Sequence, residues 1–114
     1  MNVTAESYGH AVILNLKGDL VEDTLATFQQ AVDHQMGGKD VVDLVLNLRE
    51  VPFVDSAAME CLLDLQDRLA EKMGQVRLVK CTPEVRKILE ITRLDTTFEI
   101  FEDIPEAIQA TEAA

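Results

Sequence analysis

The sequence predicts a single α/β domain, spanning residues 1–114, that is built on a mixed and mostly parallel β-sheet. Short apolar runs of strand length alternate with longer segments whose apolar residues recur every three or four positions, the spacing of an amphipathic helix. Strand–helix–strand units of this kind join parallel strands through right-handed crossovers. Two strand-like runs near the amino terminus are close enough to pair as an antiparallel hairpin, which makes the sheet mixed. The expected order is β-β-α-β-α-β-α-β-α.

The first half of the chain is expected to form a hairpin, a helix and a central strand. Val3–Ser7 alternates weakly, as an edge strand does, and the apolar run Ala11–Leu16 follows a turn at Tyr8-Gly9. Gly37-Gly38 is expected to end the helix by turning left-handed. The helical stripe before it consists of Leu25, Phe28, Val32 and Met36. Residues 41–48 are almost continuously apolar, which is typical of a central strand covered on both faces.

The second half is expected to alternate helices and strands. A helix from Ser56 to Met73 would bury one apolar stripe and end at Gly74. That stripe consists of Met59, Leu62, Leu63, Leu69 and Met73. Thr82 followed by Pro83 is a favourable start for the next helix. The remaining elements are strands at Val76–Cys81 and Thr97–Phe101, and a last helix that Asp103 would cap and that runs through Ala110.

The charge of the chain restricts the partners that it can bind. Its 21 acidic and 10 basic residues give a net charge of −11, which repels nucleic acid and anionic lipid. We therefore expect no nucleic-acid partner and no direct contact with a membrane. An acidic surface is suited to binding a basic surface on another protein. The alternative is that the charge only keeps the domain soluble. Cys61 and Cys81 form no CxxC pair and no signal peptide is apparent, so the cytoplasm is the expected compartment.

Motifs that carry catalytic chemistry are missing from the sequence. The chain has neither the P-loop nor the G-x-G-x-x-G motif that cradles phosphate, and no G-x-S-x-G nucleophile elbow. His10 and His34 have no second ligand at metal-binding spacing. We therefore expect no enzymatic activity, no metal and no cofactor.

Ser56 is the residue that the pattern singles out, because a strand ends, turns and delivers it to the start of a helix. The free N–H groups and the positive dipole end of a helix favour a phosphate there. Serine is equally a preferred N-cap residue, so a structural role as the cap is the alternative. Ala58, Cys61 and Leu65 lie off the main stripe of this helix, and we expect them to form an apolar strip beside the serine.

The segment Phe53-Val-Asp-Ser-Ala-Ala-Met59, after Val45–Leu48, resembles the signature of STAS domains, the family of bacterial anti-sigma factor antagonists. Gly18-Asp-Leu20 is similar to an early element of that family, and Phe98–Phe101 is similar to its last strand. The resemblance implies a single STAS-like domain. It also implies a binding protein that takes part in transcription regulation by partner switching.

The resemblance further implies the chemistry of Ser56. In this family the serine after the aspartate is phosphorylated by an anti-sigma factor that is also a serine kinase, and a phosphatase resets the cycle. The unmodified protein binds that kinase. By position, Ser56 is the acceptor and Asp55 orients the loop or the kinase. Together with the apolar strip, the expected contact consists of Val54, Asp55, Ala58, Cys61 and Leu65.

Two departures from the family keep a second function open. The family has Ser or Ala and then Gly where this chain has Ala57 and Ala58, and Val21 replaces an aspartate that often follows the early element. Some STAS domains are constitutive subunits of transporters or signalling scaffolds that phosphorylation does not regulate. That role is the alternative prediction.

Overall fold

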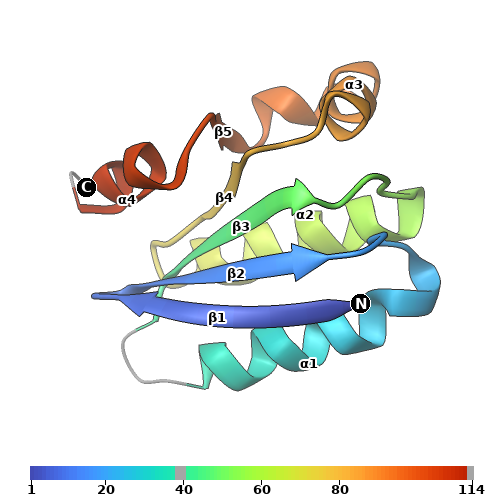
Figure 1. The fold of residues 1–114 in the computed structure, drawn as a ribbon. Helices are drawn as coiled ribbons and strands as arrows, with labels where there is room; N and C mark the ends of the chain where they lie inside the picture. Colours follow the sequence, from blue (N-terminus) through green and yellow to red (C-terminus); the bar gives the residue numbers. More distant parts are fainter. Residues whose placement is uncertain (38–40, 113–114) are drawn as a thin grey trace.

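A five-stranded sheet organises the computed structural model, which describes residues 1–37 and 41–112 (Figure 1). The strands lie in chain order, so each pairs with its sequence neighbours. They are β1 (Asn2–Tyr8), β2 (Ala11–Lys17), β3 (Asp43–Glu50), β4 (Val76–Val79) and β5 (Glu99–Phe101). The first pair is antiparallel and the others are parallel. The mixed, mostly parallel sheet that the sequence predicted is confirmed.

Helices connect the parallel strands in the predicted order. They are α1 (Leu25–Met36), α2 (Ser56–Ala70), α3 (Pro83–Ile91) and α4 (Ile104–Glu112), with short 3-10 turns at Glu22–Thr24 and Leu94–Thr96. The Thr82 hydroxyl accepts a hydrogen bond from the Val85 N–H, which confirms the predicted cap of α3. The Asp103 carboxylate accepts one from the Glu106 N–H at the start of α4.

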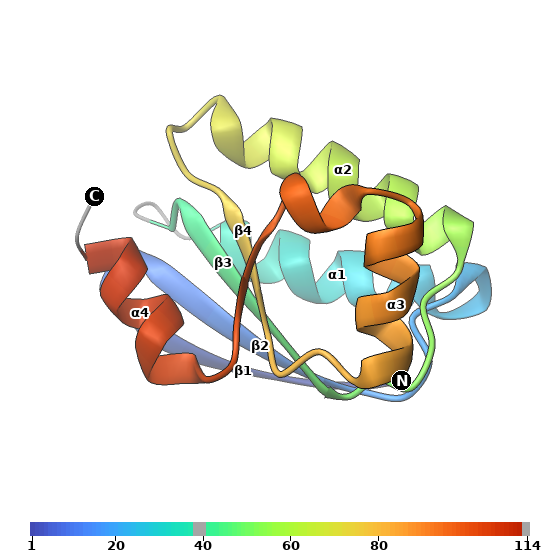
Figure 2. The same ribbon diagram turned by 90° about the horizontal axis from the view of Figure 1, so that it is seen from above.

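The two faces of the sheet are covered unequally (Figures 1 and 2). α1, α2 and α3 pack on one face and build the main core around Leu14, Leu46 and Leu78 of the central strands. α4 packs on the other face, where Ala107 contacts a smaller cluster. That cluster contains Ile13, Val45 and Val79. The central strands are therefore buried on both faces over their amino-terminal parts, as their continuous apolar sequence predicts.

A buried ion pair lies on the smaller face. Arg77 of β4 is 5% exposed, and its Nη1 donates to Oδ1 of Asp43 at 3.1 Å. The same carboxylate oxygen accepts a hydrogen bond from the Gln75 N–H. Nε of Arg77 lies 3.5 Å from the Glu99 carboxylate and makes no hydrogen bond, so Asp43 is its main compensation. Asp43 thus neutralises a guanidinium that burial would otherwise leave without a counter-ion.

The end of α2 differs from the prediction. The helix ends at Ala70, and Met73, expected in the buried stripe, is 96% exposed with a left-handed φ of 63°. Met73 and Gly74 donate to the Ala70 and Leu69 carbonyls, the hydrogen-bond pattern of a Schellman ending. A Cβ at Gly74 would overlap the carbonyl of Val42. Glycine is therefore required at 74 by close packing, while the left-handed position falls on the methionine.

Smaller differences concern the ends of elements. β4 stops at Val79, two residues short of the prediction, and β5 begins at Glu99 because the 3-10 turn at Leu94–Thr96 leads into it. Gly37 ends α1 with a right-handed φ of −67°, not the left-handed turn that was expected, and Gly38 lies outside the described residues.

Candidate functional site

The loop between β3 and α2, residues 51–55, is fastened to the segment that follows β2. The Leu20 N–H donates to the Phe53 carbonyl at 3.0 Å, and the Asp55 N–H donates to the Leu20 carbonyl at 3.2 Å. Between them lies a parallel bridge from Leu20 to Val54. Strand-like pairing therefore continues to the residue before α2 and restrains the loop that presents Ser56.

Asp55, and not Ser56, caps α2. Its backbone is extended, and its Oδ1 accepts from the Ala58 N–H at 2.9 Å. Its Oδ2 accepts from the Glu22 N–H, also at 2.9 Å, which ties the 3-10 turn to the start of the helix. One carboxylate thus satisfies donors from two segments. The alternative in which Ser56 serves as the N-cap is wrong, because the preceding aspartate has that role.

Ser56 is the first residue of α2 and is exposed. Within the part of the chain that the structure describes, its side chain makes no hydrogen bond. The helix does not need this hydroxyl as a cap, so it is available to another molecule. The position also has the free N–H groups and the dipole of a helix start, which favour a negative group.

The surface beside Ser56 combines one exposed aromatic ring with acidic side chains. Phe53, in the loop, is 47% exposed. Asp19, Glu22 and Asp23 are exposed on the turn that the Asp55 carboxylate holds, and we call these three residues the acidic rim. The sequence pattern did not single out these four residues as a contact. No sequence signal would have found Phe53, because its exposure depends on the bridge between Leu20 and Val54.

Three of the five residues expected to contact a partner are buried. Val54, Ala58 and Leu65 are at most 4% exposed and belong to the main core, so the predicted apolar strip is not on the surface. The physical reason is that α2 packs against α1 as well as against the sheet. It therefore buries a second stripe next to the first. Cys61 is half-buried, and Asp55 is half-buried as the cap.

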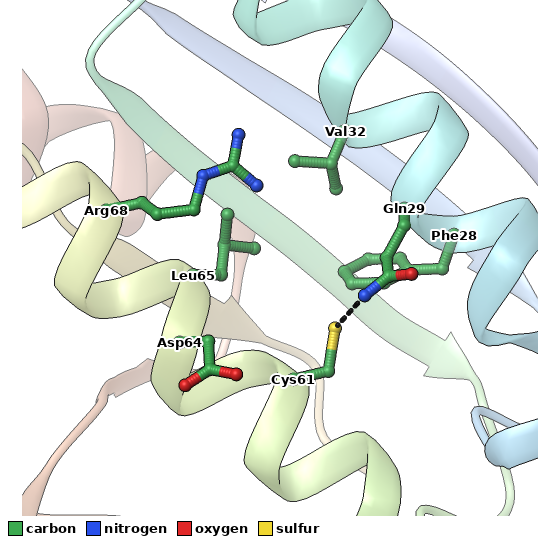
Figure 3. Close-up of a pocket in the computed structure, with 7 residues that line it drawn as sticks. All are labelled: Phe28, Gln29, Val32, Cys61, Asp64, Leu65 and Arg68. Carbon is green, nitrogen blue, oxygen red and sulfur yellow. Dashed lines mark hydrogen bonds between the residues drawn. The ribbon is translucent and has the colours of Figure 1, made fainter.

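Two members of that strip, Cys61 and Leu65, line a groove between α1 and α2 (Figure 3). Leu65 of α2 faces Phe28 and Val32 of α1 across a cavity of about 50 Å³. The Gln29 amide donates to Sγ of Cys61 at 3.5 Å. Burial raises the pKa of the Cys61 thiol. This thiol is therefore protonated at neutral pH and serves packing better than nucleophilic chemistry.

An ion pair joins the same two helices further along. Arg68 of α2 contacts Asp33 of α1 at 3.2 Å, and both side chains are more than half exposed. An exposed pair of this kind contributes about 0–1 kcal/mol, so its effect on stability is small. Within residues 1–37 and 41–112, no group of His, Cys, Asp and Glu side chains is arranged to hold a metal ion.

Comparison with known proteins identifies the family. The model of the STAS domain matches residues 2–107, so the chain belongs to the STAS domain family. A STAS-domain containing protein of Pseudomonas aeruginosa (strain UCBPP-PA14) is 41% identical over 56 residues, which are 49% of this chain and 55% of that protein. The chain thus aligns with only about half of this relative. An anti-sigma F factor antagonist of Paenibacillus polymyxa is 23% identical over 98% of this chain and 97% of its own.

Solved structures share the fold. The anti-sigma factor antagonist SpoIIAA in its unphosphorylated form has a TM-score of 0.82 at 19% identity, over 99% of this chain and 98% of that one. The murine Solute Carrier 26 family member A9 anion transporter has a TM-score of 0.81 at 21% identity, over 96% of this chain and 19% of that one. The same fold therefore occurs as a separate chain and as a small part of a transporter. Among the residues described here, no helix is long and apolar enough to cross a membrane.

Proposed function

We propose that this protein is an anti-sigma factor antagonist whose Ser56 is the phosphorylation site. In its unmodified form it binds an anti-sigma factor that is also a serine kinase. Phosphorylation of Ser56 releases that partner, and a phosphatase restores binding. The observation that supports this most strongly is that Asp55 caps α2, which leaves the Ser56 hydroxyl exposed and without a structural role. The domain acts by binding and not by catalysis.

The partner contact that we propose is centred on Phe53 and the acidic rim, because the strip predicted from the sequence is buried. Exposed aromatic side chains in the centre of an interface carry much of the binding energy. The rim supplies three carboxylates, in a chain whose net charge is −11, so the matching surface of the kinase is basic. The proposed compartment is the cytoplasm, where the two free thiols stay reduced.

A phosphate on Ser56 would act on this contact through its charge. It adds about −1.5 to −2 charges at neutral pH. The start of α2 favours it by about 0.3–1 kcal/mol, so the domain itself stays folded. Next to Asp55 and Glu22, however, the same charge has to be desolvated against a partner. Each ~1.4 kcal/mol of this cost weakens binding tenfold. Phosphorylation thus changes affinity and not fold.

The test compares variants that change the charge at the two serines of the chain. Ser56→Asp should weaken binding to the anti-sigma factor at least about tenfold, if the added charge costs ~1.4 kcal/mol. Ser56→Ala should bind as the wild type does. Ser7→Asp is the matched control, because Ser7 is exposed on β1, outside the contact. Equal affinities of the three variants, with unchanged melting temperatures, would refute the switch.

A constitutive subunit of a transporter or scaffold is the second candidate function. The similarity to part of an anion transporter favours it. In that case a stable complex would copurify with the protein, and neither Ser56→Asp nor Ser56→Ala would change its composition. The same three variants therefore separate the two functions.

A further inference from the structure

The face of the sheet on which α4 packs is covered only in part. α4 contacts Ile13, Val45 and Val79. In Figure 1, α4 lies near the beginnings of β2 and β3, and the arrowheads of both strands point away from it. The next side chains along the same face are Asn15 and Asn47, which are neighbours in register and half-buried. In a parallel sheet, the carboxyl ends of strands are where α/β proteins most often bind ligands.

A depression of about 250 Å³ lies at this end of β2 and β3. Its lining consists of Asn15, Leu16, Asn47, Arg49 and Glu50. It lies at the ends of β2 and β3, just before the segments that carry the acidic rim and Phe53, and none of its lining residues belongs to that proposed contact.

The hydrogen bonds of the two asparagines determine which of their atoms remain for a ligand. The Arg49 backbone N–H, which can only donate, binds Oδ1 of Asn47 at 3.1 Å. This orients the Asn47 amide, whose Nδ2 then donates to Oδ1 of Asn15 at 2.8 Å. Both amide oxygens are thus engaged. The remaining groups are N–H donors on Asn15 and Asn47, so the pair favours a ligand that accepts hydrogen bonds.

One cation, Arg49, lines the depression together with these donors. Arg49 follows Asn47 by two residues on β3, whereas Lys17 of β2 pairs with Glu50 across a register shift and lies outside the lining. Arg49 is exposed, and within the described residues it forms no ion pair. Arg68, Arg77 and Arg86, by contrast, each have a carboxylate partner.

Glu50 sets a limit on the ligand. Its carboxylate lines the same depression, so one cation, Arg49, stands beside one anion. This charge balance disfavours ligands with several negative charges. A ligand that also has a hydroxyl group could donate a hydrogen bond from it to the Glu50 carboxylate.

We propose that this depression binds the phosphate or carboxylate group of a small molecule. The Arg49 guanidinium would bind its two oxygens in a bidentate manner, as planar guanidinium groups do with such anions. The amides of Asn15 and Asn47 would donate to the same group. This inference is independent of the proposed phosphorylation at Ser56.

Titration of the full chain with inorganic phosphate and, separately, citrate at constant ionic strength tests the site. At least one of the two anions should cause saturable shifts of the side-chain amide NMR signals of Asn15 and Asn47. If only phosphate saturates, the site binds phosphate groups, and if only citrate saturates, it binds carboxylate groups. Arg49→Gln should weaken binding at least tenfold. Lys87→Gln should leave it unchanged, because Lys87 is an exposed lysine on α3.

Three results would overturn the proposal. The first is a shift that stays linear with both anions and equals that in chloride. The second is binding of equal strength in Arg49→Gln, and the third is an equal loss in Lys87→Gln. The backbone spectrum of each variant shows whether it is folded, and Arg49→Ala is a second variant with the same expectation if Arg49→Gln does not fold. Ser56 is intact in all of them, so these results do not depend on the phosphorylation switch.

Discussion

Replacing Asp55 with alanine should destabilise the protein, because one carboxylate holds both the start of α2 and the turn that carries Glu22. Loss of an N-cap costs about 0.5–2 kcal/mol. Loss of the second hydrogen bond adds about 0.5–1.5 kcal/mol. The expected sum is therefore about 1–3 kcal/mol in the free energy of unfolding, or ~4–12 °C in melting temperature for a domain of this size.

Urea unfolding followed by circular dichroism measures this loss. Asp55→Asn should recover most of it, since asparagine is as good an N-cap as aspartate. Asp67→Ala is the matched control: Asp67 is exposed on the same helix, and its replacement should change stability by less than about 0.5 kcal/mol. If Asp55→Ala unfolded at the same urea concentration as Asp67→Ala, the Asp55 carboxylate would not stabilise the start of α2 and the 3-10 turn in the way that its two hydrogen bonds indicate.

Three further changes test the fold. Asp43→Ala should cost about 3–5 kcal/mol, because it leaves Arg77 buried without a counter-ion. Gly74→Ala should cost more than about 1 kcal/mol, because its Cβ would overlap the Val42 carbonyl. Burial raises the pKa of Cys81 to about 11 from the ordinary value of 9.0, so the thiolate forms in the unfolded chain before it forms in the folded one. Stability should therefore fall by about 2 kcal/mol as the pH rises from 9 to 11, and Cys81→Ala should lack this component.

Each of these changes has a control in the same chain. Asp33→Ala removes the exposed partner of Arg68 and should cost at most about 1 kcal/mol, so an equal loss in Asp43→Ala would contradict the role of burial. Met73→Gly relieves a left-handed residue and should stabilise by about 1 kcal/mol, the opposite sign to Gly74→Ala. A Cys81→Ala variant with the same alkaline loss as the wild type would show that other groups cause it.

The order and type of the elements could be predicted from the sequence because burial patterns along a strand or helix are local. Residues 41–48 read as a buried strand, which the structure has at Asp43–Glu50, and the helix start read at Thr82-Pro83 is confirmed. Which faces of two helices pack together depends on contacts between residues that are far apart in the sequence. Ala58 and Leu65 looked like a separate strip because nothing in the sequence of α2 indicates that α1 covers it.

The candidate site could be predicted in position but not in detail. The Asp-Ser pair after a strand correctly located the start of α2. Which of the two residues caps the helix depends on whether the helix begins at residue 55 or 56, and the sequence does not determine a helix end to one residue. The Asp55 contact with Glu22 joins residues that are 33 positions apart. Phe53 is exposed only because the bridge between Leu20 and Val54 holds the loop, and that pairing is also not local.

The intact mass of the protein from its own cells, measured before and after phosphatase treatment and followed by mapping of the modified peptide, tests whether Ser56 is a phosphorylation site. We expect a fraction that carries one phosphate, located on Ser56, that phosphatase removes and that Ser56→Ala abolishes. A protein that never carries phosphate on Ser56, even when it is bound to its anti-sigma factor in the presence of ATP, would refute the switch.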